Sequence, residues 1–326
     1  MSIDEQVPEI PSGLRPEASE FSFDLDQVLS SVVSVRSEIP EDAFTATSLG
    51  TDRRGHGVVI TDRGLVLTIG YLIVEATQVW LIDGTGRAIA GTVAGYDQET
   101  GFGLIQALDP TGLTPMIIGR SGELVEGEPV IFAGSGGRAQ ALKTEVVSIR
   151  EFAGYWEYLL DQAIFTSPPH PFWGGGALIG SDGTLRGIGS LFVQDSIKDG
   201  VTQEGNMVVP IDILEPILGD LATSGRSTKP HRPWLGLFTA ETANKVVVAG
   251  LWDGGPAEVA GVEIGDLVLE VDSTPVTGMA DMLRRIWALG DAGVEVPFMV
   301  FRDRSVQEVI IQSACREDYH KRPRMH

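Results

Sequence analysis

Cysteine is nearly absent from the sequence: Cys315 is the only one in 326 residues. A single thiol excludes an internal disulfide and any metal site built from several cysteines. Zinc-ligand spacing within a helical pattern is also missing among the histidines, which are His56, His170, His231, His320 and His326. The sequence therefore predicts neither a metal site nor a cofactor.

Positive charge is scarce as well. Lysine and arginine together number 24, whereas aspartate and glutamate number 45, and the formal net charge is −21. This excess of negative charge repels phosphate backbones and anionic lipid head groups, so it argues against nucleic acid and membrane surfaces as partners. Basic proteins remain compatible with it.

Long apolar runs are the third missing feature. No stretch approaches the roughly 18 uninterrupted apolar residues of a membrane-spanning helix. Residues 1–14 contain Asp4, Glu5 and Glu9 and no apolar core of signal-peptide length. We therefore expect a cytoplasmic protein.

Glycine, by contrast, is abundant, with 40 residues beside 18 prolines and 43% hydrophobic residues. From residue 56 to about residue 210, short β-rich runs alternate with turn signals, as in 65–68 after the turn at 62–64. Short strands at nearly regular spacing are typical of sandwiches and barrels, not of alternating strands and helices. The predicted fold class is mainly β.

The chain is long for one domain, because a domain commonly holds about 100 to 200 residues. Residues 1–20 are polar and acidic and are predicted to form a flexible N-terminal arm. The first folded domain is expected at 21–223. A proline-bearing linker, SGRSTKPHRP, is expected at 224–233, and a second domain at 234–314. Residues 315–326 are expected to form a C-terminal tail.

Three segments of the second domain occur in the order typical of a PDZ domain and resemble one. They are WLGL at 234–237, GGPAEVAGVEIGDLVLEVDSTPV at 254–276 and MADMLRRIWALG at 279–290. The resemblance implies a module in which an extended peptide adds to a sheet edge and its C-terminal carboxylate is held by backbone N–H groups. Protein or peptide C-termini are therefore the expected partners.

The resemblance also implies which residues bind the peptide. The carboxylate loop would be Trp234-Leu235-Gly236-Leu237, in which Gly236 lets the backbone approach the carboxylate closely. Leu237, Met282 and Ile286 would line an apolar pocket for the last side chain of the ligand. The alternative interpretation is that these side chains only pack the core of the domain.

Three segments of the first domain carry a second resemblance. They are GHGVVITDRGLVLTIGYLIVEA at 55–76, YDQETGFGLIQ at 96–106 and HPFWGGGALIGSDGTLRGIGS at 170–190. Followed by a PDZ-like domain, they are similar to the HtrA/Deg family, which joins a trypsin-like double β-barrel to a PDZ domain. The catalytic histidine, aspartate and serine of that family fall on Tyr71, Gly101 and Gly174.

These three positions lack the chemistry of a serine protease. A serine nucleophile needs a base that takes its proton and a third group that orients the base. The phenol of Tyr71 is protonated at pH 7, because the reference pKa of tyrosine is about 10, and glycine has no side chain. The sequence therefore predicts a pseudoprotease, not an enzyme, that acts as a scaffold, adaptor, chaperone or assembly factor through its PDZ groove and barrel surfaces.

The alternative function is a serine endopeptidase whose active site is relocated or completed by a partner. The residues available for it are Ser135, in the GSGG run at 134–137, and the two histidines near the former site, His56 and His170. We interpret Ser135 as part of a turn after the strand at 129–133. Both histidines are interpreted as packing residues.

Aromatic residues gather near the former catalytic turn. The N–H groups of residues 172–174 are candidates for holding an anion, but Phe172 and Trp173 replace small residues of the family and are interpreted as filling the cleft. The segment 150–171 is also rich in aromatics, which serve either a protein interface or the barrel core. They are Phe152, Tyr155, Trp156, Tyr158 and Phe165.

Two further aromatics bear on assembly. Relatives in the family commonly form trimers through aromatic residues near the N-terminus, and Phe21 and Phe23 stand in that region. The resemblance therefore implies a trimer, while packing of both rings on the barrel is the alternative. A complex with an active paralogue is the other expected assembly.

Overall fold

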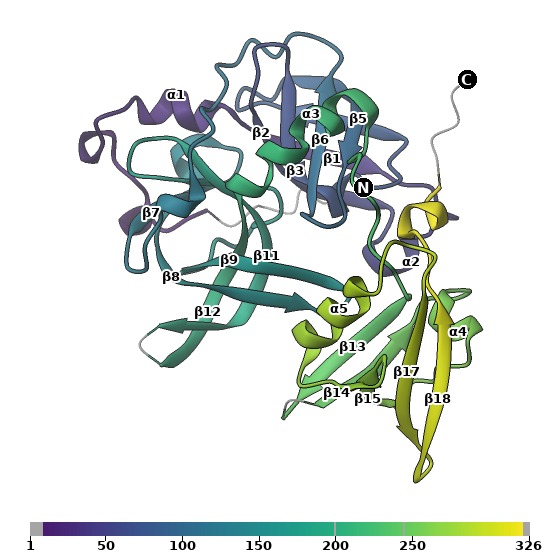
Figure 1. Ribbon diagram of the computed structural model, residues 1–326. Helices are drawn as coiled ribbons and strands as arrows, with labels where there is room; N and C mark the ends of the chain where they lie inside the picture. Colours follow the sequence, from purple (N-terminus) through teal and green to yellow (C-terminus); the bar gives the residue numbers. More distant parts are fainter. Residues whose placement is uncertain (1–8, 199, 244, 322–326) are drawn as a thin grey trace, which may run out of the picture. The chain divides into compact units, whose positions relative to one another are not determined.

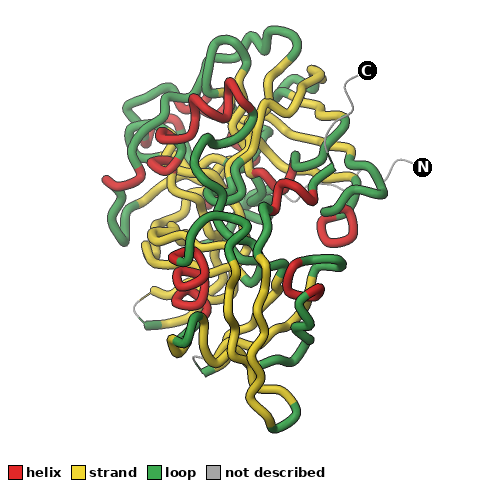
Figure 2. Tube along the Cα trace, turned by 45° about the vertical axis from the view of Figure 1, so that its right-hand side comes forward, coloured by secondary structure: helices red, strands yellow, loops and turns green. Residues whose placement is uncertain are grey.

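The computed structural model describes residues 9–198, 200–243 and 245–321. Strands account for most of its regular structure, and the helices are short (Figures 1 and 2). The described chain divides into two compact units. The first comprises residues 9–150, 162–227 and 321, and the second comprises residues 151–161 and 228–320.

The first unit begins with a closed antiparallel barrel. Its strands are β1 (Val32–Glu38), β2 (Asp52–Val59), β3 (Leu65–Ile69), β4 (Gln78–Ile82), β5 (Ala88–Tyr96) and β6 (Phe102–Ala107). They close in the order β1-β2-β3-β6-β5-β4. Successive strand side chains point to opposite faces of the barrel wall. Val66 and Leu67, neighbours on β3, both have no exposed surface, so both faces of this strand are covered.

A second closed barrel completes this unit. Its strands are β7 (Pro129–Ala133), β8 (Ala141–Gly154), β9 (Tyr158–Ser167), β10 (Ala177–Ile179), β11 (Leu185–Lys198) and β12 (Val201–Pro210), closed in the order β10-β11-β12-β9-β8-β7. Phe132, Leu178 and Val208 are fully buried in one cluster of its core. The mainly β, trypsin-like double barrel predicted from the sequence is confirmed.

Short helices accompany the barrels. They are α1 (Leu25–Ser30), α2 (Ala46–Leu49) and α3 (Glu215–Ser224), with 3-10 turns η3 (Gly70–Leu72), η4 (Ser121–Glu123), η5 (Gly137–Gln140) and η6 (Ile211–Ile213). The side chain of Asp24 caps α1 by accepting from Gln27 N. α3 buries Ile217 and Leu221, as its helical spacing predicts, and ends at Gly225.

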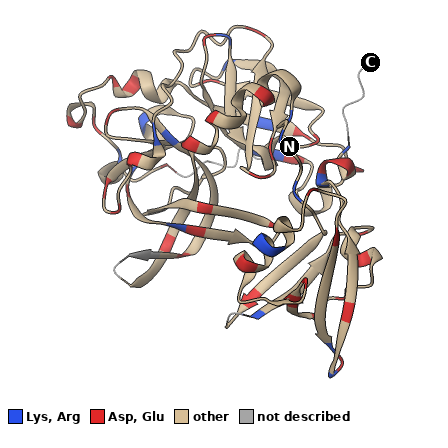
Figure 3. Ribbon diagram, viewed as in Figure 1, with Lys and Arg blue, Asp and Glu red and all other residues tan. Residues whose placement is uncertain are grey.

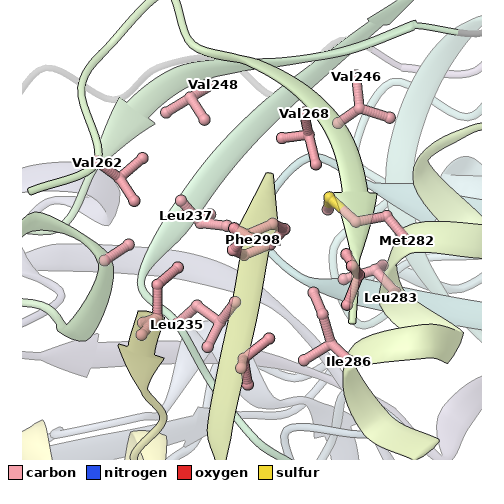
Figure 4. Close-up of a cluster of buried hydrophobic side chains, with 14 of the residues drawn as sticks. Leu235, Leu237, Val246, Val248, Val262, Val268, Met282, Leu283, Ile286 and Phe298 are labelled. Atoms are coloured by element: carbon pink, nitrogen blue, oxygen red, sulfur yellow. The ribbon is translucent and has the colours of Figure 1, made fainter. Parts of the chain in front are cut away.

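The second unit has the sheet and helices of a PDZ domain. Its elements are β13 (Leu237–Thr242), β14 (Lys245–Leu251), α4 (Pro256–Val259), β15 (Leu267–Val271), β16 (Thr274–Pro275), α5 (Met279–Ala288), β17 (Glu295–Arg302), β18 (Ser305–Gln312) and η7 (Arg316–Tyr319). The sheet order is β13-β14-β15-β17-β18. α5 directs Met282, Leu283 and Ile286 onto the sheet, where they meet Phe298 and Leu237 (Figure 4).

The predicted flexible arm at 1–20 is corrected for its described part. Residues 12–14 and 18–20 form the 3-10 turns η1 (Ser12–Leu14) and η2 (Ala18–Glu20). Ile10 is only 2% exposed, its N–H donates to Ala139 O, and its own carbonyl accepts from Arg15 Nε. One buried apolar side chain thus fixes a segment whose acidic composition suggested a solvated arm. Residues 1–8 lie outside the described part.

The predicted domain boundaries also change. The segment 151–161, expected inside the first domain, belongs to the second unit. The second half of the predicted linker does too, because Ala292 N donates to His231 O and the Arg232 guanidinium lies 4.2 Å from the Trp287 ring centre. The predicted tail starts as η7, where Tyr319 packs on a ring of the second unit. Residues 322–326 of that tail lie outside the described residues.

Phe23 shows how aromatic side chains near the N-terminus are used within the first unit. Its ring lies so close to Gly183 that an added Cβ there would be 2.7 Å from it. The Phe21 and Phe23 ring centres are 5.1 Å apart. Phe23 therefore packs on the barrel, in line with the second of the two interpretations given to this pair.

Charged side chains are spread over both units (Figure 3). Arginines pair with the more numerous acids, as Arg186 does with Glu123 and Asp182, and Arg302 with Glu263 and Asp266. Within the described ranges, no helix has both the length and the apolar character needed to cross a bilayer.

The turn that precedes β10 generates a stability prediction. Gly175 has φ +77°, and a Cβ there would lie 1.9 Å from the His56 carbonyl oxygen. We expect Gly175→Ala to destabilise the first unit by more than about 3 kcal/mol in urea unfolding, because both the backbone and its neighbour must shift.

Gly219→Ala is the matched control. Gly219 lies inside α3 with no atom within 4 Å of an added Cβ, so alanine there is expected to stabilise by about 0.5–1 kcal/mol. Equal effects of the two variants would contradict the description of the turn.

Candidate functional site

The glycine-rich turn before β10 is hydrogen-bonded to both barrels of the first unit. Gly174 O accepts from His56 N in β2 at 2.8 Å, and Gly175 N donates to Gly189 O in β11 at 2.8 Å. Gly176 N donates back to Trp173 O at 3.0 Å. The backbone of this turn is therefore held in one shape by hydrogen bonds from the surrounding strands.

The three positions matched to the catalytic triad come together at this turn. Gly70 N donates to Gly101 O at 2.7 Å, which places Gly101 beside η3 and therefore next to Tyr71. The Tyr71 hydroxyl donates to Ser190 O at 2.8 Å, and a Cβ added to Gly174 would lie 2.8 Å from that hydroxyl. The phenol thus occupies the space into which a side chain at position 174 would project.

The state of this tyrosine follows from its surroundings. Burial raises the pKa of the Tyr71 phenol well above its ordinary value. The hydroxyl is therefore protonated at neutral pH and acts as a donor to Ser190 O. It cannot accept a proton from a nucleophile under these conditions.

His56 is the buried imidazole nearest to the turn. Its Nδ1 accepts from Ser135 N at 3.1 Å, and its carbonyl accepts from Thr68 Oγ1 at 2.6 Å. Burial, with His170 nearby, lowers the pKa of His56 to about 4. The ring is therefore neutral, and its proton lies on Nε2, which has no hydrogen-bond partner among the residues described. Neither ring nitrogen offers a lone pair to a nucleophile.

His170 is fixed in the same region. Its backbone N–H donates to the Asn206 side-chain oxygen at 2.7 Å. Its ring stacks on that of Phe132, with ring centres 5.2 Å apart. Nε2 lies 3.2 Å from Gln140 O, and Nδ1 lies 2.8 Å from Phe172 O and 3.1 Å from Phe172 N, so both ring nitrogens have backbone partners. Burial lowers the pKa of His170. These contacts are those of a packing residue.

Phe172 and Trp173, which were predicted to hold an anion or to fill the cleft, differ in their contacts and in their exposure. The Phe172 N–H already donates to His170, so it is not directed at a ligand. Phe172 is 37% exposed, and its role in filling the cleft stays a prediction. The Trp173 ring is half-buried, with its centre 5.7 Å from that of Phe192.

The carboxylate loop of the second unit binds a carboxylate. The N–H groups of Leu235, Gly236 and Leu237 donate to the Glu157 side chain at 2.9, 2.7 and 2.8 Å. Gly236 has φ +80°, a conformation that favours glycine. Trp234 is not part of this set, because its N–H donates to Ala314 O.

The predicted apolar pocket is a closed cluster. Leu237, Met282 and Ile286 are at most 1% exposed (Figure 4). Leu159, from the 151–161 segment, is buried in the same cluster. These residues therefore pack the core of the second unit together with a side chain of the hairpin.

Glu157, which the sequence analysis did not single out, is the acceptor of the carboxylate loop. Burial raises the pKa of the Glu157 carboxyl to about 7, while its three N–H donors and the charge of Arg316 act in the opposite direction. The only feature that the sequence analysis found around Glu157 was the enrichment of aromatic residues in the segment 150–171. No motif links position 157 to the loop at 235–237.

A second group missed by the sequence reasoning could hold a metal ion. Ligand atoms of His231, Cys315 and Glu317 lie within 4.8 Å of one another in the second unit. Burial raises the pKa of the Cys315 thiol, which favours the protonated form over a thiolate ligand. The expectation that the protein has no metal stays a prediction.

Two barrels with this turn, followed by a sheet with a carboxylate loop, define a trypsin-like peptidase domain joined to a PDZ domain. The family model of the trypsin-like peptidase domain matches residues 55–188, and that of the PDZ domain matches residues 233–312. This combination, with the relatives described next, supports membership of the HtrA family.

Curated relatives match most of the chain. Serine protease PepD of Mycobacterium tuberculosis is 27% identical over 302 residues, or 85% of this chain and 62% of PepD. A DegP-like endoprotease of Pseudomonas fluorescens is 26% identical over 81% of this chain and 57% of its own length. Serine endoprotease DegS of Salmonella typhimurium is 24% identical over 91% and 86%. The chain thus spans about three fifths of the first two relatives.

The solved structures agree on the fold. The HtrA-type protease AlgW with tripeptide superposes with a TM-score of 0.53 at 18% identity, covering 92% of this chain and 97% of AlgW. At this identity the likeness concerns the fold alone.

The prediction that the chain is not an enzyme is contradicted by its relatives. PepD, DegS and the DegP-like protein are all named as serine proteases or endoproteases, at about a quarter identity. A catalytic triad is defined by geometry and not by sequence position. Replacement at Tyr71, Gly101 and Gly174 is therefore not sufficient to infer a lost activity.

The neutral state of His56 predicts acid sensitivity of the first unit. The ordinary pKa of 6.5 applies when the chain is unfolded, against about 4 when it is folded. Between these values the unfolded chain binds the extra proton, so stability falls as the pH drops. We expect His56 to account for a loss of about 2 kcal/mol between pH 7.5 and pH 5 in urea unfolding.

His56→Gln keeps an acceptor for the Ser135 N–H and removes the titration, so its stability should change less over this range. His231→Gln, in the second unit, is the control. The description of His56 would be wrong if wild type and His56→Gln lost equal stability.

Proposed function

We propose that this HtrA-family chain binds the C-termini of proteins through the loop at 235–237 and acts as a scaffold, adaptor, chaperone or assembly factor. The observation that carries the proposal is the convergence of three backbone N–H groups on one carboxylate. Such an arrangement recognises a carboxylate by geometry and by partial positive charge. The PDZ domain supports peptide binding as the general activity.

The edge of the sheet supports the same activity. β13 follows the carboxylate loop directly, and Thr239 N in this strand donates outward to the carbonyl of Tyr155, a residue outside the sheet. One N–H group on the outer side of β13 is therefore bonded to a backbone carbonyl from outside the sheet. Main-chain pairing at an edge and capture of a carboxylate are the two contacts of peptide addition.

The wider role rests on charge and on the family. A net charge of −21 favours partners with basic segments near the bound C-terminus. A homotrimer or a complex with an active paralogue would present several such loops at once. The cytoplasmic location stays a prediction from the sequence.

The first test measures binding of a labelled peptide with a free C-terminal carboxylate and an apolar last residue, against the same peptide amidated. We expect binding of the free acid only, because amidation removes the charge that the three N–H groups recognise. Gly236→Ala should weaken binding about tenfold or more by tilting the central N–H.

Gly265→Ala is the control, since Gly265 also has positive φ (+98°) in the same unit but lies outside the loop. Its affinity should match wild type. Equal affinity for acid and amide would refute the proposed function.

A serine endopeptidase is the second candidate function. It is favoured by the names of the relatives and by the position of Ser135, whose N–H bonds His56. In the present arrangement the free proton of His56 is on Nε2, so proton transfer from Ser135 requires a rearrangement or a partner.

Labelling by a fluorophosphonate probe, located by mass spectrometry, and casein cleavage test this candidate. Labelling of Ser135 with cleavage that Ser135→Ala abolishes would establish it. Absence of both, with a known trypsin-like protease as positive control, would exclude it for the isolated chain.

A further inference from the structure

The carboxylate loop of the second unit is already occupied by the chain itself. Glu157 lies at the tip of the β8–β9 hairpin, in the segment 151–161 that belongs to the same compact unit. Oε1 of Glu157 accepts from Gly236 N and Leu237 N, and Oε2 accepts from Leu235 N. Both oxygens are therefore used, as they would be in a terminal carboxylate.

The backbone before Glu157 forms one hydrogen bond with the edge strand of the sheet. Tyr155 O, two residues earlier, accepts from Thr239 N in β13 at 2.9 Å. The Tyr155 and Phe238 ring centres are 6.1 Å apart, so the side chain also lies over this edge. Trp156 O accepts from Arg316 Nη1 at 3.3 Å. The segment thus combines a bound carboxylate with edge pairing.

The hairpin also supplies the apolar part of a ligand. Leu159 is 7% exposed and belongs to the cluster of Leu237, Met282 and Ile286, which the sequence predicted as the pocket for a ligand side chain. A peptide that presents a carboxylate and an apolar side chain would need the contacts that Glu157 and Leu159 now make. The two cannot be bound at once.

One arginine holds both strands of the tip. Arg284 in α5 forms ion pairs with Glu151 on β8 and with Asp161 on β9. Figure 1 shows the ends of these strands beside α5. All three side chains are well exposed, so the pairs orient the tip more than they stabilise it.

The backbone of Glu157 indicates that its position is maintained by these contacts. Residues 155–157 form the three-residue loop between β8 and β9, and Glu157 has φ +61°. Glycine is the usual residue at that position of a three-residue hairpin loop. A strained non-glycine residue persists where surrounding contacts fix it and often marks a functional contact. At Glu157, the contacts are the hydrogen bonds from the carboxylate loop.

We propose that the tip of the β8–β9 hairpin is an internal ligand of the carboxylate loop, and that a C-terminal peptide binds by displacing Glu157. This inference rests on the proposed peptide binding. Its consequence is a reduced apparent affinity, because only the fraction of molecules with an undocked tip is competent to bind.

Glu157→Gly is the most direct variant, since it removes the carboxylate and relieves the strain at φ +61°. Glycine at this position is therefore compatible with the hairpin turn. The probe is a fluorescein-labelled ten-residue peptide ending in tyrosine, tryptophan and leucine with a free carboxylate, and its amide is the negative control. We expect Glu157→Gly to bind the free acid about tenfold or more tightly than wild type.

Two further variants separate charge from general effects. Glu157→Gln keeps the side-chain shape but loses the negative charge, so it should also bind more tightly than wild type, by a smaller factor. Glu308→Gln removes an exposed glutamate from β18 of the same unit and should match wild type. Equal affinity of Glu157→Gly and wild type for the free acid would overturn the internal ligand while leaving peptide binding intact. No binding of the free acid by any variant would instead refute the proposed function.

Hydrogen exchange on the wild-type chain tests the proposal without a variant. Saturating free-acid peptide should increase exchange at residues 155–157 while the N–H groups of 235–237 stay protected, since one carboxylate replaces another. Unchanged exchange at 155–157 with bound peptide would show that the tip is not displaced.

Discussion

Three backbone N–H groups that donate to one carboxylate are the central interaction of the second unit. A buried N–H without an acceptor costs about 1–3 kcal/mol, so three buried N–H groups in one loop need an acceptor. The chain meets this requirement with Glu157. The length of β8 and β9, the positive φ at their tip and the membership of 151–161 in this unit all accompany the placement of that side chain at the loop.

Polar groups at the glycine-rich turn of the first unit are bonded in another way, by the turn and the strands around it, with His56 Nε2 as an exception among the described residues. The Tyr71 hydroxyl is bound to Ser190 O, and His56 holds the Gly174 carbonyl with its N–H and the Ser135 N–H with its ring. The trypsin-like fold thus retains a hydrogen-bonded framework at this place without a side chain at 101 or 174. Chemistry here would need a nucleophile from another residue, as the names of the relatives require us to consider.

Strand periodicity and turn signals were sufficient to predict a mainly β fold, because they depend on local alternation. The two barrels and the PDZ sheet were implied by the resemblance of short motifs to the HtrA/Deg family. The carboxylate loop was predicted from WLGL, except that Trp234 bonds Ala314 instead. Glu157 could not be predicted, because 78–80 residues separate it from its donors and its direction depends on hairpin register. The buried Ile10 was missed for a related reason: composition averages over a segment and hides one anchoring side chain.

Glu157 belongs to the same chain as the loop that it binds, and this connection affects the affinity of any competing ligand. A ligand joined to its site by a short connection acts at an effective concentration of the order of millimolar. A free chain end of ordinary strength, present at low abundance, is outcompeted by such a neighbour. Displacement of Glu157 as proposed therefore requires a chain end that is locally concentrated to a similar level or that binds the loop more tightly than Glu157 does.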